Sequence, residues 1–335
     1  MRPDVLARRI LHLIPVLFGV TVIAFLMMSA TPGDPAEIML AGQNASAQQV
    51  ASLRHDMGLD LPLSDRFGRF VVHALEGDFG QSLFHRRPVA SVIAERLPAT
   101  IELSVAALVL ALVVAIPLGV LAGLRRGSVL DRLASIGSLL GVSMPGFWFG
   151  ILLLILFAVR LRLLPVSGEI DFSAAPPPVT GFLLVDSLLA GRLDSFTDTL
   201  RHLALPAITL ALPMAAVLTG VVRASMQEVL RRNYITFARA KGLPPSRVLL
   251  LHALKNALLP AVSVAALETG SLLGGNMIVE TVFGWPGLGR LVVESIFQRN
   301  YPLVQAAVLL YAVTYVLINL AADLLYTVLN PRVRL

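Results

Sequence analysis

The sequence predicts an all-α integral membrane protein with six transmembrane helices. Of its 335 residues, 56% are hydrophobic and only 14% are charged, whereas a soluble domain carries about a quarter charged residues. A helix needs about 20 mostly apolar residues to cross a bilayer, because every backbone amide in lipid must be bonded within its own segment. Six stretches meet this condition, at residues 10–28, 101–124, 136–159, 203–222, 257–279 and 303–322.

The first and the shortest apolar runs need separate interpretation. Residues 10–28 follow three arginines, as in a signal peptide, but the run of about 19 apolar residues exceeds the usual length and no small-x-small cleavage site follows. We therefore expect a membrane anchor. A seventh run, residues 179–190, is too short to span, follows three prolines and contains Asp186. It is predicted to lie in a loop, at the surface or the interface.

The orientation follows from the distribution of arginine and lysine, because positive loops are retained in the cytoplasm. With the N-terminus inside, the cytoplasmic segments 1–9, 125–135, 223–256 and 330–335 hold 15 basic and 3 acidic residues, and the opposite side holds 12 basic and 15 acidic. An even number of spans then returns the C-terminus to the cytoplasm. The prediction is N-in/C-in, with residues 1–100 forming one helix plus a large external loop and residues 101–335 forming a five-helix core.

The cytoplasmic loop 223–256 predicts a helix, a turn and a second helix. Gly242 allows a left-handed end to the first helix, and the two prolines at 244 and 245 prevent its continuation. Ser246 is expected to cap the second helix. Seven basic residues face a single acid, Glu228. From the residues alone, two interpretations stay open: a surface for a protein partner, or a basic loop on anionic lipid headgroups.

The fifth apolar stretch combines small residues with one deep acid. Gly270, Ser271, Gly274 and Gly275 remove side-chain bulk, and Gly270 with Gly274 gives the small-xxx-small spacing of close helix contacts. Glu268 lies deep enough that a charge is costly unless it faces a polar cavity or a partner. It is either a functional group on a solute path or a carboxyl that fixes one helix to another.

Other polar and turn residues are assigned structural roles. Glu102 and Asp323 lie near span ends, where water is expected to reach them. Pro145 in the third stretch permits a kink, which is found in gating helices and in static bundles alike. Trp285 follows the fifth stretch in a tight glycine-rich turn and is a candidate interfacial anchor.

Several functional classes are disfavoured. The chain has no cysteine, and its six histidines are scattered, so no metal site is predicted. Its two lysines lie outside any GxxxxGK[ST] phosphate loop, and no catalytic motif is present, so no catalytic residue is assigned and the chain is not expected to be an enzyme. The net charge of +6 is spread between apolar runs, which argues against nucleic-acid binding.

Long motifs occur in order, nearly from end to end. They are PGDP from Pro32, MGLDLPLSDRFGRF from Met57, GDFGQSL from Gly77, ERLPATIELS from Glu95, SMPGFWFG from Ser143, RASMQEVL from Arg223, ARAKGLPPSRVLLLHALKNALLP from Ala238, VETVFGWPGLGRLVVESI from Val279 and NPRVR from Asn330. Through them the chain resembles the dipeptide/oligopeptide-type permease subunits of bacterial ABC importers, in particular the member of the pair with the long first external loop.

The resemblance implies a type I importer permease architecture in the bacterial inner membrane and a set of partners. These are a second homologous permease, two ATP-binding cassette ATPases that bind ATP and Mg²⁺, a periplasmic substrate-binding protein and membrane lipids. No cofactor is expected in this chain itself. The implied cargo is di- or oligopeptides or related small solutes, among which the resemblance does not choose.

The resemblance also implies roles for individual residues. The coupling helix that docks on an ATPase is carried over to Thr236, Ala238, Arg239, Ala240, Lys241, Gly242 and Leu243. Thr236 replaces the glutamate of the general importer motif, and the distance from Gly242 to Pro260 exceeds the general spacing. The translocation path is assigned to Glu268, Gly270, Ser271, Gly274 and Gly275, and the external gate or binding-protein contact to Trp285, Pro286 and Gly287.

Two other classes compete with this interpretation. One is an ion-coupled transporter or passive channel that works without an ATPase, and the other is a membrane receptor or scaffold. Ion coupling typically shows several ionisable groups near the midplane, often with inverted repeats. The sequence shows neither feature, which favours the importer subunit.

Overall fold

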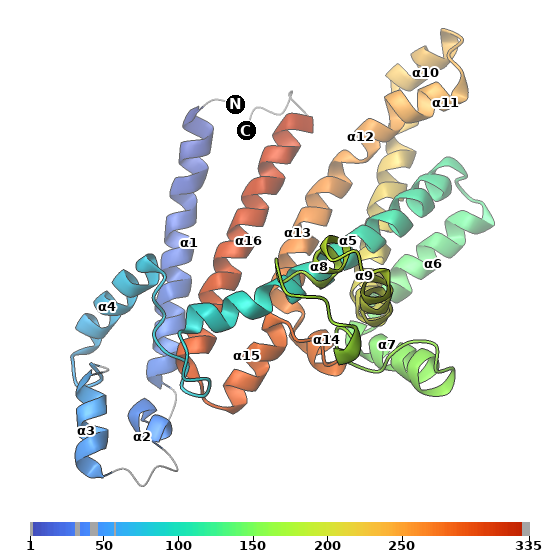
Figure 1. Cartoon of the computed structure of the whole chain (residues 1–335). Helices are drawn as coiled ribbons and strands as arrows, with labels where there is room; N and C mark the ends of the chain where they lie inside the picture. Colours follow the sequence, from blue (N-terminus) through green and yellow to red (C-terminus); the bar gives the residue numbers. More distant parts are fainter. Residues whose placement is uncertain (1–2, 31–33, 41–45, 57, 330–335) are drawn as a thin grey trace.

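The computed structural model describes residues 3–30, 34–40, 46–56 and 58–329, and these residues are almost wholly helical (Figure 1). The N-terminal third contains α1 (Pro3–Ala30), α2 (Pro35–Leu40), α3 (Ala47–Asp56), α4 (Leu63–Glu76) and α5 (Val89–Leu124). The middle contains α6 (Val129–Ser143), α7 (Gly146–Leu153), η1 (Leu154–Arg160), η2 (Phe172–Ala174), α8 (Leu183–Leu189) and α9 (Leu193–Val229). The last third contains α10 (Asn233–Ala240), α11 (Pro245–Arg247), η3 (Val248–Leu254), α12 (Lys255–Ala257), α13 (Leu259–Gly275), α14 (Met277–Val282), α15 (Leu288–Phe297) and α16 (Tyr301–Leu329).

The two longest helices, α5 and α9, form the centre of the molecule because small residues let them approach closely. A Cβ added at Gly119 on α5 would lie 2.7 Å from the Cβ of Val222 on α9, and one added at Gly123 would lie 2.7 Å from the Cβ of Met226. Fully buried alanines continue this contact along α5. Such a stripe of small residues is the usual basis of close helix packing in membranes.

The third predicted span is not one straight helix. The chain bends by 101° between α6 and the α7–η1 segment, with Met144 in an extended conformation immediately before Pro145. Proline disfavours helical geometry in the residue that precedes it, which accounts for the break. Both arms still pack on α9, because Gly141 faces Ala216 and Gly150 faces Thr209. The kink predicted at Pro145 is therefore confirmed, and whether the bent pair forms the one predicted span over residues 136–159 stays a prediction.

The number of spans is confirmed only in part. In the described chain, α5, α9 and α16 are each long and apolar enough to cross a membrane, and two bent helix pairs raise the number to five. The second pair bends by 45° near Pro260. In α1 the apolar helix counted over described residues is Leu13–Met27, shorter than the others. Six spans therefore remain a prediction.

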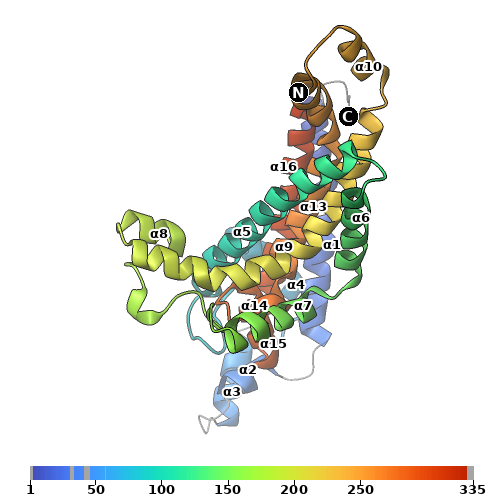
Figure 2. The same ribbon diagram turned by 90° about the vertical axis from the view of Figure 1, so that its right-hand side faces the viewer.

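The two ends of the elongated molecule differ in what they carry. α1 begins and α16 ends at the end where α10 and α11 also project, while α2 and α3 lie at the opposite end (Figure 1). Figure 2 shows α8 and the start of α9 standing out to one side. This arrangement groups the segments predicted to be cytoplasmic, while the assignment of that end to the cytoplasm stays a prediction.

Candidate functional site

The predicted coupling loop forms a packed hairpin at the end of α9. α10 and η3 close over a small core in which Met226, Ile235 and Ala238 contact Val248. Gly242 ends the first arm with φ +76°, the left-handed conformation that glycine adopts without steric cost. The predicted role of Gly242 in the turn is confirmed. The hairpin is therefore a packed protrusion with its own small apolar core.

Two details of this hairpin differ from the prediction. The first helix is interrupted, because α9 ends at Val229 and α10, which stops at Ala240 just before Gly242, begins at Asn233. Ser246 does not cap the second helix, since Pro244 occupies the cap position, no side chain bonds there and Ser246 lies inside α11. The prolines themselves fix the start of the helix, because proline favours the first turn.

The hairpin exposes basic side chains together with the aromatic rings of Tyr234 and Phe237. Lys241 stacks with its Nζ 4.6 Å from the ring centre of Phe237, whose side chain is 62% exposed. Thr236, Arg239, Ala240 and Gly242 are also exposed, Leu243 is half-buried, and Ala238 alone of the predicted set is buried in the hairpin core. An exposed aromatic ring among cations is typical of an anchor for a protein partner.

The base of the hairpin is braced to α6. Asp131 accepts a hydrogen bond from the Arg223 guanidinium on α9, and its other oxygen accepts one from the backbone of Gly127 at 2.8 Å. Asp131 is buried, and the guanidinium offsets its charge. These contacts therefore tie the base of the hairpin to α6 as well as to α9.

Glu268 lies half-buried on α13, one turn from Leu272 and two turns from Ala261, both of which pack against α5 and α9. This spacing places Glu268 on the face of α13 that looks toward the central helices and not toward lipid. Among the described residues it makes no hydrogen bond or ion pair. Both interpretations of Glu268, a functional group on a solute path and a carboxyl that fixes one helix to another, stay predictions.

The small residues of α13 are only partly placed. Gly270 is buried, and a Cβ added there would lie 2.8 Å from the ring of Tyr315 on α16. The close contact predicted for it is thus confirmed. Ser271 is exposed. Gly274 and Gly275 lie at the end of α13, where the surroundings of their side positions are outside the described structure, so their assignment stays a prediction.

A buried polar network links α5 to the segment after α13. The carboxylate of Glu280 accepts hydrogen bonds from the Thr100 hydroxyl at 2.8 Å and from the backbone of Arg290 at 2.9 Å. Thr100 in turn accepts the backbone N–H of Leu288 at 2.7 Å. We call Thr100, Glu280 and Leu288 the outer staple. The sequence analysis did not predict this network, although Glu280 within the motif VETVFGWPGLG could have indicated a buried polar group.

Trp285 belongs to the same buried structure. Its ring is fully buried, and its Nε1 donates to the carbonyl of Ala99 at 2.9 Å, so it does not anchor the chain at the lipid interface. Gly287 is buried, and any side chain there would collide with Glu280 and Thr100. Pro286 is half-buried. The three residues predicted for the external gate thus hold α14 and α15 on α5, while the gate role itself stays a prediction.

The segment between η1 and α9 wraps over the outer part of these helices. Glu102 is buried and accepts the backbone N–H of Leu184 at 2.8 Å. The expectation that water reaches it is wrong, although its structural role is confirmed. Asp186 is buried and accepts hydrogen bonds from the backbone of Val179, Thr180 and Gly181. The run 179–190 accordingly forms a short helix in a loop, as predicted.

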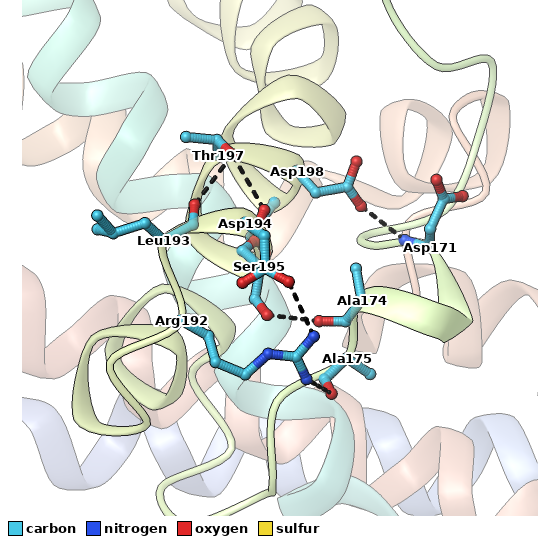
Figure 3. A network of polar contacts seen from close by, with 10 residues as sticks. Asp171, Ala174, Ala175, Arg192, Leu193, Asp194, Ser195, Thr197 and Asp198 are labelled. Atoms are coloured by element: carbon cyan, nitrogen blue, oxygen red, sulfur yellow. Dashed lines mark hydrogen bonds and ion pairs between the residues drawn. The ribbon is translucent and has the colours of Figure 1, made fainter.

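Figure 3 shows how this segment is fastened to the start of α9. Asp198 accepts the backbone N–H of Asp171 at 2.8 Å, and Ser195 donates to the carbonyl of Ala174 at 2.6 Å. Arg192 donates to the carbonyl of Ala175 at 3.0 Å. Nearby, burial and then the charge of Glu102 raise the pKa of Glu169 to about 7.

Comparison with known protein families identifies the class of this protein. The family model described as binding-protein-dependent transport system inner membrane component matches residues 115–335, and the N-terminal model of such membrane components matches residues 4–104. The chain belongs to this family. It is a permease subunit of a binding-protein-dependent transport system, and the resemblance stated from its motifs is confirmed.

Individual relatives of these inner membrane components are similar over their full lengths. The chain is 44% identical over 329 residues to a di/tripeptide transport system permease protein, DppB, of Pseudomonas aeruginosa, covering 98% of each chain. It is 43% identical over 330 residues to the dipeptide permease DppB of Escherichia coli K12, covering 98% of this chain and 97% of the relative. It is 39% identical over 327 residues to the glutathione permease GsiC of the same strain, covering 98% of this chain and 97% of the relative.

A solved structure has the same fold. An inward-facing structure of the MetNI methionine ABC transporter aligns with a TM-score of 0.51 at 18% sequence identity, covering 71% of this chain and 96% of the solved one. At this identity the likeness concerns the fold alone. It agrees with the predicted architecture of an importer permease.

Proposed function

We propose that this chain is one of two permeases in an ATP-driven importer for short peptides. It works with a second homologous permease, two ATPases that bind ATP and Mg²⁺, and a periplasmic substrate-binding protein in the bacterial inner membrane. The observation that carries the proposal is the coupling hairpin, a packed protrusion with exposed Phe237 and Lys241 whose base is braced to two helices. Such a shape suits a groove in a partner that performs mechanical work.

The cargo follows from the relatives named for di- and tripeptides and for glutathione, itself a tripeptide. All these solutes carry an ammonium group and carboxylates. A carboxylate without a hydrogen-bond partner in the described part of its own chain, such as Glu268, suits an ammonium passing along the face of α13. The path is shared with the second permease, because one half-buried acid gives little polar lining for a peptide.

The decisive experiment compares two glycine substitutions. Gly242 and Gly191 both have left-handed backbones, with φ of +76° and +66°, and no atom lies within 4 Å of a Cβ at either position. Gly→Val therefore imposes the same strain, about 1–2 kcal/mol, in the coupling hairpin at Gly242 and in the distant turn between α8 and α9 at Gly191. A tagged chain should copurify with an ATPase and a second permease, and Gly242→Val should release the ATPase whereas Gly191→Val should not.

The alternative, an ion-coupled transporter or passive channel, makes the opposite prediction. Uptake of a labelled dipeptide would then continue after deletion of the ATPase genes and would respond to an ionophore. Equal retention of the ATPase by both variants would also contradict docking at this hairpin.

A further inference from the structure

Two adjoining cavities of opposite character lie where α4 packs beside α1. The first has a volume of about 300 Å³ and is lined by Arg66, Arg69 and His73 of α4. The second has a volume of about 400 Å³, and every side chain that lines it is apolar except Thr21. The hydroxyl of Thr21 already donates to the carbonyl of Leu17 at 2.7 Å, so the side chains that line the second cavity offer a ligand no free hydrogen-bond donor.

The cavities adjoin at Phe79, which lines both. The helix α4 is amphipathic and contributes to both cavities. Its residues Arg66, Arg69 and His73 line the first cavity, and Val71 and Ala74 line the second. Figure 1 shows α4 lying along the side of α1. A single amphipathic molecule can therefore place a polar group in one cavity and an apolar chain in the other.

The two cavities lie at different depths along the helices. On α1 the first cavity is lined by Phe25 and the second by Thr21 and Leu17, while on α16 the first is lined by Gln305 and the second reaches from Ala306 to Val313. On each helix the far end of the second cavity lies eight residues from the first cavity, or about 12 Å at 1.5 Å per residue. Since α1 and α16 run in opposite directions, both helices place the apolar cavity deeper in the membrane. In the predicted orientation the basic cavity lies toward the external surface.

The basic side chains that line the first cavity indicate which polar group of a ligand would bind there. Arg66 and Arg69 make no ion pair within the described chain. One acid, Asp78, is among the residues that line this cavity, and its Oδ2 lies 3.8 Å from Nδ1 of His73. Two guanidinium groups without an ion pair among the described side chains favour a phosphate, which arginine binds through paired hydrogen bonds.

We propose that these cavities bind one anionic phospholipid of the outer leaflet, with its phosphate at Arg66 and Arg69 and an acyl chain between α1, α5 and α16. The bound lipid joins the N-terminal helix and its external loop to the core that carries the coupling hairpin. This site is independent of what the importer carries.

The test uses the full chain with its partner subunits in phosphatidylcholine nanodiscs. Traces of photoactivatable phosphatidylglycerol or phosphatidylcholine with the same diazirine-labelled acyl chain are added, and crosslinked peptides are mapped by mass spectrometry. Labelled phosphatidylglycerol should mark the peptides around Leu17 and Ile93, which line the apolar cavity. Each arginine near an anionic headgroup should contribute about fivefold in occupancy, so R66Q/R69Q should reduce this label about thirtyfold.

Two further variants separate the site from general lipid contact. R160Q/R201Q removes the same charge from exposed positions that line neither cavity, and it should keep the label. Ala94→Leu narrows the apolar cavity at an exposed α5 position without touching the arginines, and it should lower acyl labelling even if the double arginine variant does not assemble.

Three results would overturn the proposal. Equal labelling by both lipids, unchanged in R66Q/R69Q and Ala94→Leu, would mean annular lipid only. Full competition by soluble glycerophosphoglycerol would mean that the site recognises phosphate without a membrane. Loss of the label on addition of the substrate-binding protein alone would mean that the arginines face that protein.

Discussion

Thr100 on α5 donates a 2.8 Å hydrogen bond to the buried carboxylate of Glu280, although 180 residues separate them. The same hydroxyl accepts the backbone N–H of Leu288. One threonine therefore satisfies two buried groups that belong to the other end of the chain. The packing of α14 and α15 on α5 depends on this side chain more than on any surface ion pair, because exposed pairs contribute little.

Replacing Thr100 with valine should lower the stability of the chain. The change keeps the shape but leaves one oxygen of Glu280 without a donor and the N–H of Leu288 without an acceptor, at about 1–3 kcal/mol per buried group. The expected result is a melting temperature several degrees lower in detergent, measured by light-scattering or dye-based unfolding. Ser91→Ala removes an exposed hydroxyl from the same helix and should leave the melting temperature unchanged. An unaltered Thr100→Val protein would show that the outer staple is dispensable.

Gly287→Ala should be more damaging than its size suggests. The added methyl group would collide with the Glu280 carboxylate and the Thr100 hydroxyl, and overpacking typically costs about 1–3 kcal/mol. We expect reduced yield of assembled transporter and reduced uptake. Gly137→Ala is the matched control, because no atom lies within 4 Å of a Cβ there. If both variants assembled equally well, the close approach at Gly287 would not be essential.

Glu169→Gln should change the pH dependence of stability. Burial and the neighbouring Glu102 raise the pKa of Glu169 from its ordinary value of 4.5 to about 7, so the folded chain retains a proton that the unfolded chain releases. Below pH 4.5 the carboxyl is protonated in both states. As the pH rises from 4.5 to 7 the unfolded state is favoured, and above 7 the loss of stability is complete. Glutamine mimics the protonated form, so the variant should unfold at a higher temperature than wild type at pH 8 and at a similar temperature at pH 4.5. Parallel curves for the two proteins would contradict a raised pKa.

Glu268→Gln should impair uptake without reducing assembly. The carboxylate lies on the face of α13 toward the central helices and makes no bond within the described chain, so its removal takes away charge and no packing. Uptake of a labelled dipeptide by cells is the measurement, with the amount of chain in the membrane measured by immunoblot. Glu37→Gln, at an exposed position on α2, controls for loss of one negative charge. Uptake at the wild-type rate would return Glu268 to a structural role.

Features carried by local pattern could be predicted from the sequence. Apolar length located the long helices α5, α9 and α16, and Gly242 with its following prolines located the turn of the coupling hairpin. Both depend on residues close together in the chain. The motifs also identified the family, because their order is specific.

Features that depend on contacts between distant residues could not be predicted. Buried Glu102 is hydrogen-bonded to Leu184, and buried Trp285 is hydrogen-bonded to Ala99. These partners are far away in the sequence, so no local pattern indicates them. The 101° bend is a mixed case. Pro145 indicated a break, but only the contacts of Gly141 and Gly150 with α9 set its direction.

That bend has a consequence for biosynthesis. α6 and the α7–η1 segment contain 15 residues each, about 22 Å of helix, so neither arm alone reaches across a hydrocarbon core of about 30 Å. Their partner α9 begins more than 30 residues after η1 ends and emerges from the ribosome later. The nascent chain therefore depends on the insertion machinery to shelter this segment until α9 is made, and a truncation before α9 should be degraded in the cell.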